Sequence, residues 1–219
     1  MVITQLKIYT NRLREQAGFY KNILGLTLTA NSENSVEFKI GHSILSLCEK
    51  DSATPYHLAI NIPSNKAHEA LHWLKQRVEI LKDAGNELIE FENWNAKAIY
   101  FYDADKNIVE LIARKNLNIE TTEPFDQNQF LGISEIGLSV QNIAETYKSI
   151  NAIKTTPLYD GNFDRFCAAG DEQGLFIIID QNKKGWFPCN DFAYTSDFKV
   201  SGDINFDFCN GQITKTATG

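Results

Sequence analysis

One pattern, a strand-like segment followed by a helix-like segment, occurs three times along this chain and limits its fold more than any other feature of the sequence. The strand-like segments lie at residues 5–10, 57–62 and 135–140, and in each of them apolar side chains recur at every second position. Alternation with a period of two predicts a β-strand with one apolar face. A pattern repeated along a chain indicates repeated structural units.

Each strand-like segment is followed by a polar residue that can begin a helix. Asn11, Ser64 and Asn142 have side chains that can accept hydrogen bonds from the free N–H groups of a first helical turn. Apolar residues then recur at spacings of three and four, which is typical of a helix with one buried face. The longest of these patterns predicts a helix over residues 67–81.

Short strand-like segments joined by turns follow each expected helix. Three such pairs occur, at residues 35–40 with 43–48, 98–102 with 108–112, and 165–169 with 175–179. The unit is therefore strand–helix–strand–strand–strand, which predicts an α+β fold built from repeated βαβββ modules. The segment from Trp186 onward has strand-like runs but no helix pattern, and we expect it to be a truncated fourth unit.

These units predict the domain organisation of the chain. We expect residues 1–115 to hold units one and two as a pair, with the active cavity between them. Residues 116–130 are rich in Asn, Thr, Glu and Gln, which is typical of a linker. Residues 131–219 would then hold the third unit and the truncated fourth.

Charge and cysteine content exclude several classes of partner. The chain has 219 residues, with 28 acidic against 21 basic side chains and a formal net charge of −7. Binding of phosphate groups needs clustered basic side chains, so we expect neither a nucleic acid nor a membrane as partner. No stretch approaches the roughly 20 apolar residues of a membrane span, and we expect no signal peptide. The four cysteines form no C-x-x-C pair, which suits reduced thiols and a cytoplasmic protein.

Three separated segments occur in the order seen in a known superfamily. They are residues 19–26 (FYKNILGL), 57–63 (HLAINIP) and 100–111 (YFYDADKNIVEL). In these segments the chain resembles the vicinal oxygen chelate superfamily, which includes the lactoylglutathione lyases (glyoxalases), the bleomycin-resistance proteins and the extradiol ring-cleavage dioxygenases. The resemblance implies that βαβββ modules pair into curved mixed sheets around a cavity. It extends over residues 1–115 and more loosely over residues 131–180.

The resemblance also implies a metal site, because ligands in this superfamily come from the first and last strands of the units. Carried over onto this sequence, the ligand positions are Gln5 and His57 on first strands and Glu110 on a last strand. Such a set suits a divalent ion (Fe, Mn, Ni or Zn), whose open positions would bind two adjacent substrate oxygens. Glu110 would be a ligand, or a catalytic base if the metal is held otherwise.

The sequence departs from both metal patterns of the superfamily. Gln5 lies where the dioxygenases have a histidine, and Ser46, which takes the position of Glu110 in unit one, lies where the lyases have a glutamate. Two functions therefore stay open. The first is a metal-dependent lyase, isomerase or ring-cleavage dioxygenase acting on a small molecule with adjacent oxygens. The second is a metal-free protein that binds or sequesters a small ligand, in which the three candidate ligands would form a hydrogen-bonded polar cluster.

Unit three carries Glu135 and Ile177 at the corresponding positions. A single glutamate opposite an isoleucine is not a site, so we expect unit three to be structural. A pocket between units one and two would be lined by polar and aromatic side chains, although aromatic residues also fill ordinary cores. The candidates are Tyr9, Ser46, Trp94, Tyr100 and Tyr102. The chain would act as a monomer or a homodimer.

A second motif, His68-Glu69-Ala70-Leu71-His72, matches the H-E-x-x-H pattern of zinc proteases. On the expected helix, however, both histidines lie about 100° or more from the centre of the apolar face, on a polar flank. The extended form of the motif also fails, because Lys75 and Val78 lie where glycine and histidine would be needed. We therefore expect two surface histidines and no zinc site.

Overall fold

The computed structural model describes residues 1–216 and contains four units, of which three follow the expected βαβββ order. Unit one consists of β1 (Ile3–Thr10), α1 (Leu13–Gly18), a π-helical turn (Phe19–Ile23), β2 (Thr27–Asn31), β3 (Ser35–Ile40) and β4 (Ser43–Glu49). Unit two consists of β5 (His57–Ile62), α2 (Ala67–Lys75), the short strands β6 (Ile80–Leu81) and β7 (Ile89–Phe91), a 3-10 turn (Glu92–Trp94), β8 (Ala96–Tyr102) and β9 (Ile108–Arg114).

Units three and four complete the chain after two 3-10 turns, Lys115–Leu117 and Gln127–Gln129. Unit three consists of β10 (Gly132–Val140), α3 (Ile143–Ile153), β11 (Leu158–Asn162), β12 (Phe166–Asp171) and β13 (Gly174–Asp180). Unit four has three strands and, within residues 181–216, no helix: β14 (Phe198–Gly202), β15 (Phe206–Cys209) and β16 (Gln212–Lys215). The repeat and the α+β class predicted from the sequence are confirmed.

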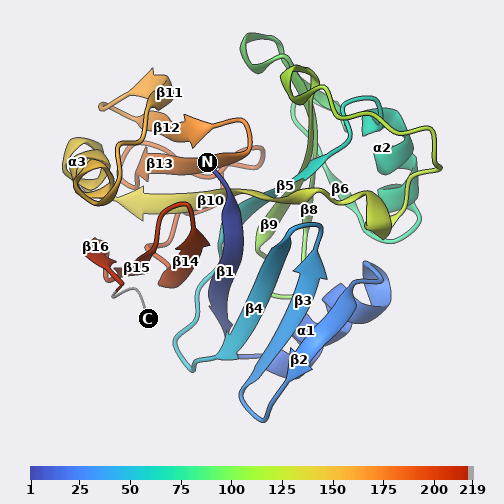
Figure 1. Cartoon of the computed structure of the whole chain (residues 1–219), viewed down its shortest axis with the longest axis horizontal. Coiled ribbons are helices and arrows are strands. Elements are labelled where there is room, and N and C mark those ends of the chain that lie inside the picture. The colour runs from blue at the N-terminus through green and yellow to red at the C-terminus, as the bar shows by residue number, and fades with distance from the viewer. Residues whose placement is uncertain (217–219) are drawn as a thin grey trace.

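The four units pair in an order that differs from the expected one. A seven-stranded sheet joins unit four to unit one in the order β16-β15-β14-β1-β4-β3-β2. A nine-stranded sheet joins unit three to unit two in the order β11-β12-β13-β10-β5-β9-β8-β6, with β7 also on β8. Figure 1 shows β14 beside β1, and β10 crossing the molecule beside β5. Units one and two therefore do not share a sheet, and the predicted pairing within residues 1–115 is wrong.

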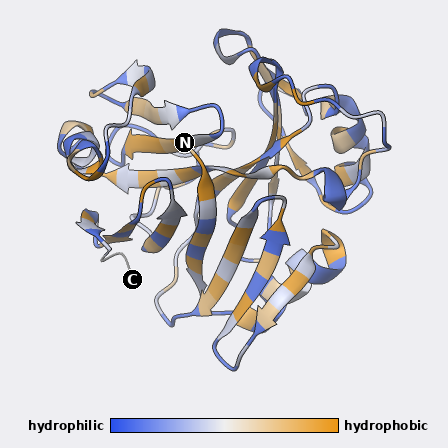
Figure 2. Cartoon of the chain, in the orientation of Figure 1, coloured by the Kyte–Doolittle hydropathy of each residue, from blue (hydrophilic) through white to orange (hydrophobic). Residues whose placement is uncertain are grey.

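Strand alternation positions the two faces of each sheet. Within β5, Leu58 and Ile60 belong to the main hydrophobic core, whereas Ala59 belongs to a second apolar cluster on the opposite face. The same division occurs in β9, where Val109 joins the main core and Ile108 joins the second cluster. Figure 2 shows apolar and polar residues alternating as orange and blue bands along strands of the seven-stranded sheet. Functional side chains can therefore collect on one face while the other face packs on the helices.

The junction between units one and two depends on one buried carboxylate. Asp103, in the turn between β8 and β9, accepts hydrogen bonds from Gln16 Nε2 (2.5 Å) and Tyr20 Oη (2.8 Å) of unit one. It also accepts bonds from the backbone and side chain of Asn107, at 3.0 and 2.8 Å. Burial raises the pKa of Asp103 to about 6, although these hydrogen bonds oppose the shift.

Helix α2 is shorter than predicted. It ends at Lys75, before the expected residues 76–81, and its buried positions include Trp73 and Ala70. The apolar residue Val78 packs against the core from the following turn, so the spacing of apolar side chains continued beyond the helix itself. Within residues 1–216, every helix is too short or too polar to cross a membrane.

Candidate metal centre

The nine-stranded sheet places two glutamates on either side of a small residue. Glu110 of β9 lies opposite Ala59 of β5, and Ala59 lies opposite Glu135 of β10. Tyr100 of β8 continues the row on the far side of Glu110. Because the methyl group of Ala59 fills little space, the two carboxylates can approach each other across the central strand. His57 lies two residues before Ala59 and therefore shares its face.

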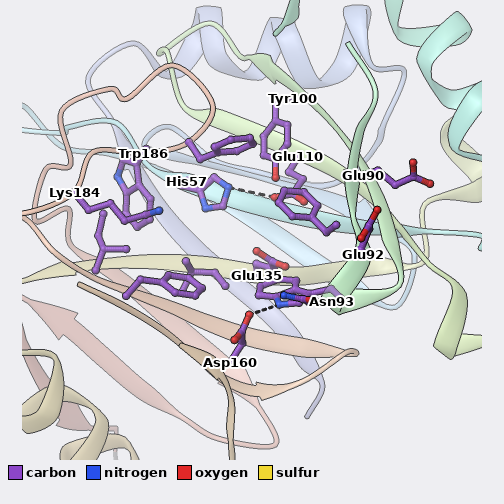
Figure 3. Close-up of a pocket in the computed structure, with 16 residues that line it drawn as sticks. His57, Glu90, Glu92, Asn93, Tyr100, Glu110, Glu135, Asp160, Lys184 and Trp186 are labelled. Atoms are coloured by element: carbon purple, nitrogen blue, oxygen red, sulfur yellow. Dashed lines mark hydrogen bonds and ion pairs between the residues drawn. The ribbon is translucent and has the colours of Figure 1, made fainter. Parts of the chain in front are cut away.

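His57, Glu110 and Glu135 form one buried cluster. Each residue contributes one nitrogen or oxygen atom to a set whose members all lie within 4.8 Å of one another. Nε2 of His57 lies 3.4 Å from Oε2 of Glu110. The three residues are 7%, 2% and 2% exposed, respectively, so water screens their interactions poorly. Figure 3 shows the three side chains pointing toward a common region of the cavity.

Burial of two carboxylates in one place shifts the proton equilibria of the cluster. Burial and, to a smaller extent, the charge of Glu110 raise the pKa of Glu135 to about 8, whereas Arg114 opposes this shift. Burial and Glu110 also raise the pKa of Tyr100 well above its ordinary value. The phenol of Tyr100 therefore stays neutral at physiological pH and keeps its O–H donor.

Arg114, the last residue of β9, connects both sides of the cluster. Its Nη2 donates a hydrogen bond to Oε1 of Glu135, and its Nε donates to Oδ1 of Asn61 at 3.2 Å. The side chain is fully buried, and its guanidinium carbon lies 5.3 Å from the centre of the Trp94 ring. Nη1 has no hydrogen-bond partner within residues 1–216. Arg114 thus spans three adjacent strands from β9 across β5 to β10.

A cavity of about 500 Å³ opens above the cluster. Its upper wall comes from the segment between β13 and β14, where Trp186 stacks on His57 with ring centres 5.2 Å apart. Phe187 packs edge-on against Tyr100 at 5.3 Å. Gly137 makes room for Trp186, because a Cβ atom at that position would lie 2.5 Å from the indole ring. The remaining apolar walls are formed by Phe91, Trp94, Phe166, Ile177 and Ile179.

Gln5 does not join this cluster, and the predicted convergence of Gln5 with His57 and Glu110 is corrected. Strand β1 lies in the seven-stranded sheet, where it pairs with β4 and β14. Nε2 of Gln5 donates hydrogen bonds to Ser46 Oγ (2.8 Å) and Glu37 Oε1 (3.2 Å) within unit one. The prediction failed because unit one pairs with unit four, so β1 lies in a different sheet from β5, which carries His57.

The five predicted pocket residues separate into two groups. Trp94 and Tyr100 line the cavity above the cluster. Tyr9 and Ser46 do not, because β1 and β4 belong to the seven-stranded sheet. Tyr102 lies beside the cavity and donates a 2.6 Å hydrogen bond to Asp191, which fastens the segment that carries Trp186. Tyr9, Ser46 and Tyr102 are therefore removed from the pocket.

Three important residues were missed by the sequence analysis. Glu135 was aligned with His57 but set aside, because unit three was expected to be structural; its position on a first strand was a usable signal. Arg114 lies two residues before the expected linker, and Trp186 was expected only as the start of the truncated fourth unit. No local sequence pattern shows that Arg114 and Trp186 reach the cluster, since both contacts depend on the pairing of units two and three.

The donor set of the cluster fits a divalent metal ion. One imidazole nitrogen and two carboxylates form a mixed nitrogen and oxygen set of the kind that binds Fe, Mn, Ni or Zn. Two buried carboxylates close to each other are costly without a positive charge, and Arg114 contacts only one of them. Ile177 occupies the fourth equivalent position and offers no ligand atom, so a bound ion would keep positions open.

The H-E-x-x-H motif lies away from the cluster, on α2. His68 and His72 are both exposed. Nε2 of His72 lies 3.0 Å from the side-chain nitrogen of Gln76, a contact on the surface of the helix. Among the described residues, the motif does not belong to a group of three or more metal-binding side chains.

Comparisons with known proteins give a sequence relative for about half of the chain and several structures of similar fold. No family model matches the chain. The metallothiol transferase FosB from Staphylococcus haemolyticus (strain JCSC1435) is 29% identical over 117 residues, which cover 50% of this chain and 81% of that protein. The sequence relative therefore corresponds to about half of the chain.

Two solved structures match most of the chain. One is a Bacillus subtilis subsp. subtilis str. 168 protein provisionally assigned as a dioxygenase, with a TM-score of 0.59, 16% identity, and coverage of 82% of this chain and 63% of that one. The other is a V278E mutant of glyoxalase I from Zea mays, with a TM-score of 0.55, 14% identity, and coverage of 81% and 66%. This chain thus spans less than two thirds of either protein. The likeness confirms the glyoxalase/bleomycin-resistance/dioxygenase fold and, with the sequence relative, the resemblance to the vicinal oxygen chelate superfamily.

Proposed function

We propose that this protein is a divalent-metal-dependent enzyme that acts on a small molecule with two adjacent oxygen atoms. The observation that carries the proposal is the buried cluster of His57, Glu110 and Glu135 beneath a cavity of about 500 Å³. The cavity is large enough for a small organic molecule. The superfamily members that the chain resembles are lyases and dioxygenases, and the FosB relative is by name a metallothiol transferase. Lyase, isomerase, ring-cleavage and group-transfer chemistry are therefore the candidate reactions.

His57, Glu110 and Glu135 would hold the ion from one side, and the substrate would approach from the cavity. A bound divalent ion would supply a Lewis acid that polarises the two substrate oxygens. The chain itself would shield the site from water, because Trp186 packs on His57 and Phe187 packs on Tyr100. Exclusion of water strengthens every electrostatic interaction within the cavity.

Glu110 is the residue best placed to move a proton. It faces His57 directly and lies opposite the neutral phenol of Tyr100. Glu135, in contrast, has one oxygen engaged by Arg114. We therefore assign Glu135 to holding the ion and Glu110 to a mixed role, as a ligand or as the catalytic base. The O–H group of Tyr100 would donate a hydrogen bond to a substrate oxygen or to Glu110.

One observation favours a second candidate, a metal-free protein that binds a small ligand. Arg114 already places a positive charge against Glu135, and His57 lies within reach of Glu110. Together these two contacts could satisfy both carboxylates without an ion. The aromatic walls of the cavity would then serve for sequestration of an apolar or planar ligand.

Metal analysis of protein purified without an affinity tag separates the two candidates. We expect close to one equivalent of Fe, Mn, Ni or Zn per chain, or uptake of one equivalent after incubation with the ion and dialysis. Absence of stoichiometric metal after this treatment would contradict the enzyme and favour the binding protein. A cytoplasmic location and a monomeric or homodimeric state stay predictions, which fractionation and light scattering can check.

A further inference from the structure

Arg114 is a fully buried charge whose contacts select one oxygen of Glu135. Its Nη2 bonds to Oε1 of Glu135, so Oε2 is the oxygen that this contact leaves free to face a bound cation. A buried arginine is rare unless its donors are used, and here Nε and Nη2 are used while Nη1 has no partner within residues 1–216. The contacts therefore hold the guanidinium in place from two directions.

The orientation of Arg114 depends on Asn61. Oδ1 of Asn61 accepts from Arg114 Nε at 3.2 Å, and Nδ2 of Asn61 donates to the backbone oxygen of Glu172 at 2.9 Å. This second bond determines which end of the amide faces the arginine. Trp94 covers the guanidinium plane at 5.3 Å. A continuous chain of contacts thus leads from Glu172 through Asn61 and Arg114 to Glu135.

We infer that Arg114 is a positioning residue, which orients Glu135 toward a divalent cation bound with His57 and Glu110. The inference rests on the proposed metal centre and adds a specific role outside the three ligands. It makes the two carboxylates unequal: one oxygen of Glu135 accepts a bond from the guanidinium, whereas Glu110 lies beside His57, with Nε2 of His57 3.4 Å from Oε2 of Glu110. Groups that orient metal ligands in this way commonly change metal affinity by about 10–100-fold when they are removed.

A competing explanation predicts the opposite sign. If Arg114 acted only as a positive charge near the cation site, its removal would strengthen cation binding, because the Coulomb repulsion between the guanidinium and the cation would be lost. Arg114→Lys separates the two explanations, because lysine keeps the charge but lacks the planar fork that contacts Asn61 and Glu135 together. Positioning predicts a loss of affinity in Arg114→Lys, whereas a pure charge effect predicts no change in this variant and tighter binding in Arg114→Met.

The experiment measures Mn²⁺ affinity by the EPR signal of the free ion, with the full chain. We expect about a tenfold loss for Arg114→Lys, a larger loss for Arg114→Met, and a loss of a few fold for Asn61→Ala, which removes the contact with Arg114 Nε and the bond to Glu172 but not the contact of Arg114 with Glu135. Arg77→Met is the matched control, since Arg77 lies over Trp73 at 4.1 Å in the same manner but outside the cavity; its Mn²⁺ affinity should equal that of the wild type.

Melting temperatures in excess chelator show whether each variant folds, and only variants that fold are compared. If Arg114→Met does not fold, Arg114→Lys and Asn61→Ala decide the question. Unchanged affinity in Arg114→Lys, or tighter binding in Arg114→Met, would overturn the positioning role while leaving the proposed metal centre standing. Absence of Mn²⁺ binding by the wild type, with Fe, Ni and Zn also failing to bind, would overturn the proposed function itself and this inference with it.

Discussion

In each sheet, side chains at equivalent positions of four neighbouring strands form a row, and the charges of these side chains differ between the two sheets. In the nine-stranded sheet the row runs through Tyr100, Glu110, Ala59 and Glu135. In the seven-stranded sheet the corresponding row runs through Glu37, Ser46, Lys7 and Lys199. Two lysines thus replace the alanine and the second glutamate, and a serine replaces the first glutamate. A positively charged row of this kind does not form a cation site.

The seven-stranded sheet also satisfies its own polar groups. Gln5 bonds to Ser46 and Glu37, Ser46 bonds to Glu37 at 2.9 Å, and Lys199 bonds to Asp207 at 2.5 Å. In the cavity on the nine-stranded sheet, Nδ1 of His57 and Nε1 of Trp186 are buried without a hydrogen-bond partner within residues 1–216. A buried polar group without a partner needs an explanation, and a bound ion or ligand is one such explanation. The comparison teaches that the repeated unit supplies the frame, and that a few residues in each row decide whether it can bind.

The largest expected effect comes from the matched pair Glu110→Gln and Ser46→Ala, which alter equivalent positions of the two sheets. Glu110→Gln should reduce affinity for Mn²⁺ or Zn²⁺ by at least about a hundredfold, because a neutral amide is a poor ligand for these ions. Ser46→Ala should leave the affinity unchanged and cost about 1 kcal/mol of stability through its lost hydrogen bonds. Titration of each purified variant with the ion measures the affinity, and chemical denaturation measures the stability of Ser46→Ala.

The stability of Glu110→Gln sharpens the same comparison. Without metal, its melting temperature should equal or exceed that of the wild type, because the variant removes one of two neighbouring buried carboxylates. Equal metal affinity in wild type and Glu110→Gln would show that Glu110 is not a ligand. A loss of metal binding in Ser46→Ala would show that the seven-stranded sheet takes part after all.

The next effect concerns the junction between units one and two, and it depends on pH. The pKa of Asp103 is raised to about 6 in the folded chain, against about 3.9 in an unfolded one. The native state therefore holds the proton more tightly, so the contribution of Asp103 to stability is largest below pH 4 and is lost as the pH rises through 6. Relative to Asp103→Asn, which cannot titrate, the wild type should lose about 2 kcal/mol between pH 4 and pH 7.

Chemical denaturation of wild type and Asp103→Asn at pH 4, 5, 6 and 7 measures this difference. The pH-independent effect of the substitution cancels, because only the change in the difference is compared. A difference that stays constant, or that grows in favour of the wild type with rising pH, would show that the hydrogen bonds from Gln16, Tyr20 and Asn107 outweigh burial.

A third comparison uses two glycines. Gly137 lies in β10 of the nine-stranded sheet, and Gly18 lies in α1 of unit one, whose strands belong to the seven-stranded sheet. Gly137→Ala should cost about 1–3 kcal/mol, because the new Cβ atom would lie 2.5 Å from the Trp186 ring and displace it. Gly18→Ala should stabilise by about 0.5–1 kcal/mol, since Gly18 is helical and its Cβ atom would meet only Asn22, at 3.9 Å. Thermal melts give both values, and tryptophan fluorescence reports the displacement of Trp186. Equal melting temperatures of the two variants would contradict the close packing of Trp186.

Local features of the fold were predictable from the sequence, whereas the partners of the units were not. Residues 108–112 were expected to form a strand, and Ile108, Glu110 and Ile112 do lie on one face of β9, because strand parity is a local property. Whether β5 pairs with a strand of unit one or with β10 is decided by packing of the whole chain, which no period in the sequence encodes. The error in Gln5 and the omission of Glu135 both follow from that single wrong pairing.

The smallest expected effect concerns α2, where the H-E-x-x-H motif offers a rival metal site outside both sheets. The double variant His68→Ala, His72→Ala should change stability by no more than about 0.5 kcal/mol per site, because both side chains are exposed. Its zinc content should match that of the wild type, since the ligands proposed here lie in the nine-stranded sheet. Glu110→Gln serves as the reference that loses the ion. Loss of zinc from the histidine variant, with retention in Glu110→Gln, would move the metal site to the helix and leave the cluster as a polar part of a metal-free cavity.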